Sequence, residues 1–222
     1  HMMGNTLRDR RKGTVLSTKV GRLLKPWFGE RPEGYQWVGP LPFEQVYDYS
    51  YDGIMRSFED SLQRLGLNKV DILYVHDIGT MTHGAEGNKP LWRQLETGGY
   101  RALQGLKSSG TISAIGLGVN EWEVLMDAFA LGDWDVFLLA GRYTLLEQTS
   151  LDPFLSTCIE RKASVVVGGP FNGGALMGTG MWNYAKAPQH VVDRVHALEA
   201  VCREFGVPIG APALQLPIAH PA

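Results

Sequence analysis

The stretch Val70-Asp71-Ile72-Leu73-Tyr74-Val75-His76-Asp77 reads as an apolar strand that carries a histidine at its end. An earlier stretch, Thr14-Val15-Leu16-Ser17-Thr18-Lys19-Val20, carries a lysine near its end in the same way. Packing alone does not call for a polar residue at the carboxyl end of a core strand. In barrels of alternating strands and helices, the residues at that rim perform the chemistry. Lys19 and His76 are therefore the first candidates for a functional site.

The rest of the chain continues the alternation of strands and helices that these two stretches begin. Mostly apolar strands are predicted at 14–20, 70–77, 112–118, 135–139 and 164–167. Helices are predicted at 51–65, 91–108, 121–131, 151–162, 189–205 and 211–220, with loops at 21–49 and 79–87. This pattern predicts an α/β protein with a parallel sheet and right-handed crossovers. No G-x-G-x-x-G motif follows the first strand, which argues against a doubly wound dinucleotide-binding fold.

The composition limits the kinds of partner that the protein can have. The 222 residues are 44% apolar and 20% charged, with a net charge of −2. These values predict one soluble domain over residues 1–222 that binds neither nucleic acid nor a membrane. Cys158 and Cys202 show no C-x-x-C spacing, so neither a disulfide framework nor a metal site is expected. This cysteine usage fits a reducing cytoplasm.

Four short motifs, in this order and at these distances, resemble the aldo-keto reductase superfamily. They are V-L-S-T-K-V-G (15–21), D-I-L-Y-V-H-D (71–77), I-G-L-G-V-N (115–120) and P-F-N-G-G-A-L (170–176). The long aromatic loop after Lys19 is similar to that of a bacterial branch of sugar dehydrogenases. That branch includes L-fucose dehydrogenase, D-threo-aldose 1-dehydrogenase and pyridoxal 4-dehydrogenase.

The resemblance implies a (β/α)8 TIM barrel of the aldo-keto reductase type. Because the chain offers five strands, the first two strands and the last strand of that barrel are expected to be missing from it. The family's catalytic Asp and Tyr lie on the second strand and the loop after it, upstream of the region that matches Gly4. The chain is therefore expected to be a single, partial barrel domain.

The resemblance also assigns roles to residues of this chain. Lys19 and His76 match the family's catalytic lysine and histidine, and Asn120 matches the residue that holds the nicotinamide carboxamide. The loop that offers backbone groups to the pyrophosphate of NADP or NAD is matched by Phe171, Asn172, Gly173 and Gly174. Simpler roles stay open for two of these features: Asn120 could cap the helix that follows it, and the glycine-rich turn could be a tight connection.

Oxidation of a hydroxyl needs a proton acceptor, and a free tyrosine has a pKa near ~10. A nearby ammonium lowers that pKa, which is the role expected for Lys19. His76 is expected to orient the substrate oxygen, although a surface lysine and a buried, satisfied histidine are the simpler interpretations. Trp27 and Trp37, which lie with Phe28 and Tyr35 in the long loop, either stack on a sugar ring or cover the barrel mouth.

These observations predict an enzyme, an NAD(P)-dependent oxidoreductase that interconverts a carbonyl and a hydroxyl. The expected substrate is a small molecule, an aldose such as L-fucose oxidised at C1 or a related small aldehyde. One alternative is a non-catalytic nicotinamide-binding or regulatory barrel that lacks the Asp/Tyr pair. Another is an unrelated barrel enzyme, an isomerase or aldolase, that uses Lys19 for Schiff-base chemistry. His83 has no partner pattern and is expected to be a surface or packing residue.

Overall fold

The computed structural model describes residues 1–30 and 39–222. Two compact units make up this backbone. The first unit comprises His1–His76 and His83–Ile115, and the second comprises Asp77–Thr82 and Gly116–Ala222. Parallel strands with helices between them occur in each unit, which confirms the expected α/β class. The single domain expected over residues 1–222 stays a prediction.

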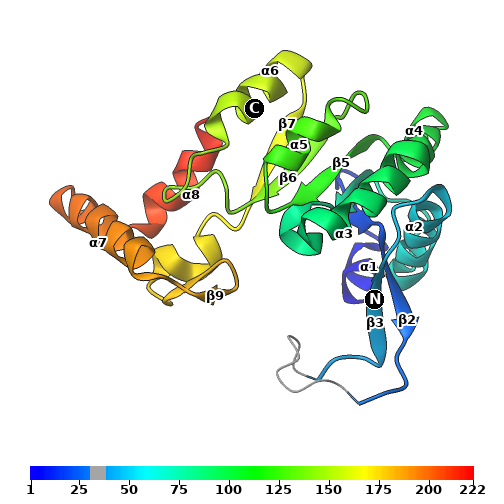
Figure 1. The fold of residues 1–222 in the computed structure, drawn as a ribbon, viewed down its shortest axis with the longest axis horizontal. Helices are drawn as coiled ribbons and strands as arrows, with labels where there is room; N and C mark the ends of the chain where they lie inside the picture. Colours follow the sequence, from blue (N-terminus) through cyan, green and yellow to red (C-terminus); the bar gives the residue numbers. More distant parts are fainter. Residues whose placement is uncertain (31–38) are drawn as a thin grey trace. The chain divides into compact units, whose positions relative to one another are not determined.

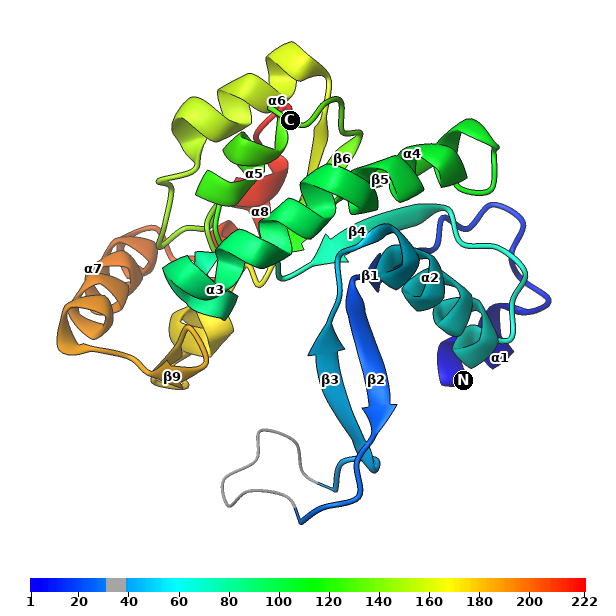
Figure 2. The same ribbon diagram turned by 45° about the vertical axis from the view of Figure 1, so that its right-hand side comes forward.

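Figure 1 shows the helices α2 and α4 of the first unit, which is built around a pair of parallel strands, β1 and β4, labelled in Figure 2. Its elements are α1 (Met2–Leu7), β1 (Ser17–Val20), β2 (Arg22–Pro26), β3 (Phe43–Tyr47), α2 (Tyr51–Leu65), β4 (Ile72–His76), most of α3 (Thr80–Gln94), the π-helix η1 (Leu95–Gly99) and α4 (Tyr100–Ser108). Helix α2 packs against β1 and α4, and α1 lies against α2. The core includes Ile54, Leu73 and Leu103, which are fully buried.

Helix α2 has the bounds that the sequence predicts, because both of its ends are encoded locally. The Ser50 hydroxyl accepts a hydrogen bond from the Gly53 amide at 3.1 Å, which satisfies one of the unpaired amides of the first turn. At the other end Gly66 adopts a left-handed conformation with φ 66°. A residue without a side chain takes this conformation at no steric cost, so the helix ends there.

The prediction of a loop over the whole of 21–49 is wrong. Strands β2 and β3 form an antiparallel hairpin, shown in Figure 2, in which Leu23 pairs with Val46. Pro26 ends β2 and Pro42 stands just before β3, so these prolines mark the strand ends. Proline lacks an amide proton and is tolerated at such positions, which explains how a proline-rich segment still forms a hairpin.

The prediction of a loop at 79–87 is also wrong, since α3 begins at Thr80. The Met81 amide and the Thr80 hydroxyl donate to the two carboxylate oxygens of Glu121, at 2.9 and 3.0 Å. Glu121 thus caps the start of α3 from 40 residues further along the chain. Gly84 interrupts the helix with non-helical angles, φ 68° and ψ 164°, so this glycine causes a kink within a helical segment.

The second unit contains the parallel strands β5, β6 and β7, with β6 paired to both neighbours. Its elements are β5 (Ala114–Val119, whose first two residues belong to the first unit), α5 (Glu123–Ala128), β6 (Val136–Ala140), the π-helix η2 (Leu151–Leu155), α6 (Ser156–Arg161), β7 (Ser164–Gly168), the 3-10 helix η3 (Asn172–Met177), β8 (Met181–Trp182), β9 (Ala185–Lys186), α7 (Gln189–Glu204) and α8 (Gly210–Ile218). Phe137 of β6 packs edge-on against Phe129 and Phe154 in its core. Within 1–30 and 39–222, the helices are too short or too polar to cross a bilayer.

Candidate functional site

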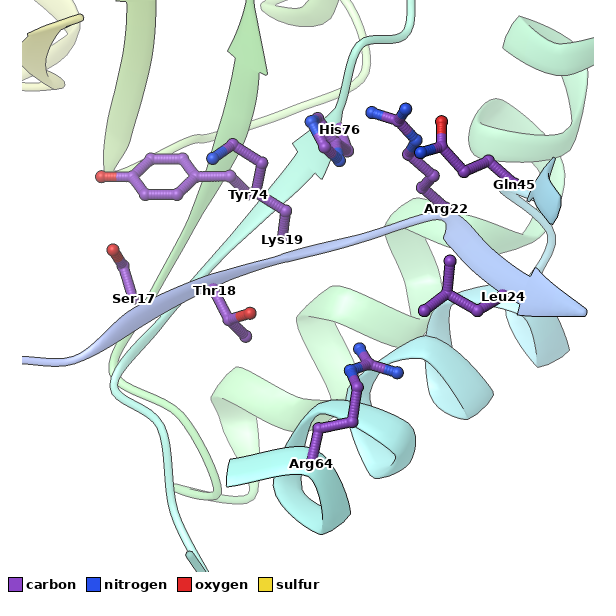
Figure 3. A pocket seen from close by; sticks show the side chains of 9 residues that line it. All are labelled: Ser17, Thr18, Lys19, Arg22, Leu24, Gln45, Arg64, Tyr74 and His76. Atoms are coloured by element: carbon purple, nitrogen blue, oxygen red, sulfur yellow. The ribbon is translucent and has the colours of Figure 1, made fainter. Parts of the chain in front are cut away.

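The first unit contains a cavity of about 420 Å³ that Lys19 and His76 share (Figure 3). Strand register explains why these two side chains meet. Lys19 of β1 lies opposite Tyr74 of β4, and His76 is two residues beyond Tyr74. Side chains two apart on a strand project from the same face, so Lys19, Tyr74 and His76 project together. The cavity is lined by Ser17, Thr18, Lys19, Arg22, Leu24, Gln45, Arg64, Tyr74 and His76.

The imidazole of His76 is neutral at physiological pH. Burial is the largest cause that lowers its pKa, and the charges of Arg22 and Lys19 lower it further, to about 3. A neutral imidazole donates a hydrogen bond from one ring nitrogen and accepts one at the other. His76 can therefore orient a hydroxyl or carbonyl oxygen without carrying charge itself. Burial raises the pKa of Tyr74, which is 2% exposed, so its hydroxyl stays protonated.

Two residues that the sequence did not single out line the same cavity. Arg22 of β2 and Gln45 of β3 lie beside His76, as Figure 3 shows. The Arg22 guanidinium also lies over the ring of Tyr47, 5.5 Å from its centroid. The hairpin brings these two side chains to the cavity, and their place there could not be predicted while the segment was expected to be a loop.

The two tryptophans expected to bind substrate are not equally well described. Trp27 follows β2, and its amide donates to the carbonyl of Pro42 at 2.8 Å. Its half-buried ring is not among the described side chains that line the cavity of Lys19 and His76. Trp37, like Tyr35, lies outside the described residues. Phe28 is 96% exposed.

In the second unit, Asn120 directly follows β5. Its side-chain amide donates to the carbonyl of Ala140 at 3.4 Å, a long bond. The residue at the N-cap position of α5 is Trp122, without a side-chain capping bond. Asn120 is therefore not the cap of this helix, and the capping interpretation is wrong. A half-buried carboxamide that makes one long bond retains most of its capacity to bind a second amide group.

The turn at Phe171 to Gly174 has three successive left-handed residues, because Asn172, Gly173 and Gly174 have φ values of 51°, 68° and 100°. The amides of Asn172 and Gly174 donate within the turn, to the carbonyls of Gly169 and Phe171. The amides of Phe171 and Gly173 donate to no other group of the described chain. Gly173 is exposed, and a Cβ at Gly174 would lie 2.4 Å from the Thr179 hydroxyl oxygen, so a side chain is excluded there. Such a turn fits a phosphate group of a nicotinamide cofactor.

A carboxylate that the sequence analysis missed holds this turn in place. Oε1 of Glu147 accepts hydrogen bonds from the side chains of Asn172 at 2.9 Å and Trp182 at 2.8 Å. Its Oε2 accepts from Arg142 at 3.3 Å. Asn172, Trp182 and Arg142 lie 25, 35 and 5 residues from Glu147 in the sequence. No local sequence motif could therefore have predicted this cluster. Hydrogen bonds to a carboxylate are stronger than neutral ones, which makes Glu147 a firm anchor for the turn.

Known proteins share both the sequence and the fold of this chain. Residues 1–222 match the Aldo/keto reductase family. The pyridoxal 4-dehydrogenase of Microbacterium luteolum is 44% identical over 236 residues, which cover 100% of this chain and 69% of that protein. The D-threo-aldose 1-dehydrogenase of a Pseudomonas species is 33% identical over 216 residues, which cover 92% of this chain and 62% of that protein. A solved aldo-keto reductase from Bacillus halodurans, in its holo form, matches with a TM-score of 0.64 at 24% identity, over 98% of this chain and 63% of that one.

The fold and the cavity define an α/β protein with polar groups gathered at the ends of parallel strands. The chain belongs to the aldo/keto reductase family. This confirms the family, the named branch and the type of fold that the four motifs indicated, and with them the oxidoreductase class.

Proposed function

We propose that this protein interconverts a carbonyl and a hydroxyl with NAD or NADP, and that it oxidises an aldose such as L-fucose at C1 or acts on a related small aldehyde. The proposal rests chiefly on one observation, the shared cavity of Lys19 and His76. The names of the two dehydrogenase relatives support the same class of substrate. The alternative of a non-catalytic nicotinamide-binding barrel is not favoured, because both of these relatives are named as enzymes.

The two side chains would divide the work of the proton transfer. A bound nicotinamide supplies the hydride chemistry. His76, as a neutral imidazole, would donate to or accept from the reacting oxygen and hold it in place. The Lys19 ammonium would stabilise negative charge that develops on the proton-accepting group beside it. This division needs one cation and one neutral hydrogen-bonding group in a single cavity, as in the first unit.

The lining of the cavity is suited to a substrate with several hydroxyl groups. Ser17, which lies two residues before Lys19 and so on the same face of β1, and Gln45 add one hydroxyl and one carboxamide to the charged groups. Hydroxyl and amide side chains both donate and accept hydrogen bonds, which matches the hydrogen-bonding groups of a sugar. Trp37 would provide an aromatic face for the sugar ring. Trp27 is not proposed for this cavity, because its ring is not among the described side chains that line it.

The residues for the cofactor would come from the second unit. Phe171, Asn172, Gly173 and Gly174 would receive the pyrophosphate, through the backbone amides of Phe171 and Gly173. Asn120 would bind the carboxamide of the nicotinamide.

The test is turnover of the intact protein with both cofactors against a panel of aldoses and pyridoxal. Lys19→Ala and His76→Ala should each lower kcat about 100-fold or more and leave cofactor affinity within about twofold. Lys12→Ala, at an exposed position, is the matched control and should keep full turnover. Unchanged turnover in either cavity variant would overturn the proposal. Tight nicotinamide binding without turnover of any compound would favour the non-catalytic alternative.

A further inference from the structure

Behind the candidate catalytic histidine lies a buried tyrosine that the proposed chemistry does not use. Tyr49 is 0% exposed, and its hydroxyl donates to the backbone carbonyl of His76 at 2.6 Å. The same hydroxyl lies 3.1 Å from Nε2 of His83. All three residues belong to the first unit. A hydrogen-bonded chain therefore runs from His83 through Tyr49 to the residue that ends β4.

Close packing surrounds the ring and the backbone of Tyr49. Its amide donates to the side-chain oxygen of Gln94 at 3.0 Å. A Cβ at Gly21 would lie 2.4 Å from the Tyr49 ring, and one at Gly99 would lie 2.2 Å from the Tyr49 carbonyl oxygen. Both glycines are thus needed for the ring and backbone of Tyr49 to fit. The hydroxyl is aimed at β4 by packing on several sides.

The role of His83 follows from counting hydrogen atoms. A phenol has one proton to donate, and in Tyr49 that proton points to the His76 carbonyl. Nε2 of His83 must then carry the proton of the second hydrogen bond and donate it to the Tyr49 oxygen. His83 is held in turn by Tyr47, whose ring meets the imidazole edge-on at 4.5 Å between centroids. The expectation that His83 is a surface or packing residue misses this directed bond.

The His76 carbonyl, which accepts the bond from Tyr49, lies where strand β4 ends. The backbone leaves the strand conformation immediately after His76, since Asp77 has a φ of 52°. A non-glycine residue in that region is strained, so the strand end needs support from outside the strand. The direction of the His76 side chain depends on the orientation of the His76–Asp77 peptide, whose carbonyl accepts the hydrogen bond from Tyr49.

We propose that Tyr49 and His83 are positioning residues that hold the His76 imidazole in the cavity it shares with Lys19. The inference rests on the proposed function, in which His76 orients the reacting oxygen. A displaced imidazole would still be neutral and still bind water, but it would meet the substrate oxygen at the wrong place. The cofactor residues of the second unit are not part of this chain of bonds, so cofactor affinity should not depend on it.

Tyr49→Phe removes only the hydroxyl, and Tyr51→Phe, at a residue 39% exposed, is the matched control. Tyr49→Phe should lower kcat about tenfold with little change in cofactor affinity, whereas Tyr51→Phe should keep kcat within twofold. His83→Leu should behave like Tyr49→Phe. His83→Gln, which keeps a donor, should restore most of the activity. Equal kcat in Tyr49→Phe and Tyr51→Phe would overturn the proposal, and so would a parallel loss of kcat, cofactor affinity and folding.

A second readout separates this inference from the proposed function. The ring resonances of His76, identified by their loss in His76→Gln, can be followed by NMR without any turnover. They should shift and broaden in Tyr49→Phe and His83→Leu, and stay unchanged in Tyr51→Phe. If Lys19→Ala keeps full turnover while the His76 signals respond as described, the proposed function fails and the positioning role stands. If turnover depends on Lys19 and His76 but the His76 ring signals do not change in Tyr49→Phe, the positioning role is refuted and the proposed function stands.

Discussion

Acid should destabilise this protein through His76 more than through an ordinary histidine. Burial, and then Arg22 and Lys19, lower the pKa of His76 from 6.5 to about 3 in the folded chain. Below pH 6.5 the unfolded chain binds a proton at this imidazole, whereas the folded chain does not until the pH approaches 3. The unfolded state then binds more protons, so the free energy of unfolding falls as the pH is lowered through this window.

The size of the effect at pH 5 depends little on the depth of the shift. At that pH the folded imidazole is almost entirely neutral, and the cost is set by protonation of the unfolded chain alone. The linkage relation then gives a loss of about 2 kcal/mol between pH 7.5 and pH 5. Substituting His76 with Gln removes the titrating group and keeps a hydrogen-bonding side chain of similar size. The difference in unfolding free energy between His76→Gln and the unmodified protein should therefore change by about 2 kcal/mol over this range.

Urea unfolding at several pH values, followed by tryptophan fluorescence, measures this difference. The contributions of the other histidines to the unfolding free energy cancel in this difference, because these residues are present in both proteins. His190→Gln, at an exposed position, is the control and should show no such change. Equal acid sensitivity of His76→Gln and the unmodified protein would refute the reasoning. His76 would then be open to protonation near neutral pH, and its role as a neutral partner of the substrate oxygen would fall with it.

Two further outcomes test the packing and the cofactor turn. Gly99→Ala places a Cβ 2.2 Å from the Tyr49 carbonyl oxygen and should lower the free energy of unfolding by about 2 kcal/mol or more. Gly105→Ala is the control: its Cβ has nothing within 4 Å, and the substitution should raise the free energy of unfolding by about 0.5–1 kcal/mol. Thermal unfolding measures both, and equal midpoints would contradict the packing described. Glu147→Gln removes the charge that binds Asn172 and should weaken nicotinamide binding about three- to tenfold in a fluorescence titration. Unchanged affinity would show that the turn does not need this anchor.

The features that the sequence predicted correctly are those whose causes lie close together in the chain. Helix α2 is an example, since its cap Ser50 and its left-handed Gly66 adjoin the helix itself. The meeting of Lys19 and His76 was also predictable, because parallel strands of one barrel direct their carboxyl ends to one rim. The exact partners of β1 and β4 then follow from register.

The features that were missed depend on partners far apart in the chain. The hairpin joins Leu23 to Val46 across a segment whose prolines suggested a loop. The start of α3 is capped by Glu121, which no rule for neighbouring residues could supply. In each case a single long-range contact outweighs the local preference for turns.

The missed hairpin changes the chemistry as well as the fold. Lys19 was expected to be the charge that matters to the site, acting on a tyrosine. In the folded chain Arg22, delivered by β2, has a larger effect than Lys19 on the pKa of His76. Burial and, after it, these two cations lower the pKa of the imidazole and keep it neutral, and a neutral imidazole is the form that can both donate to and accept from an oxygen. The hairpin thus contributes to the neutral state of His76 through Arg22, and it adds Arg22 and Gln45 to the lining of the cavity, although it carries none of the family's catalytic residues.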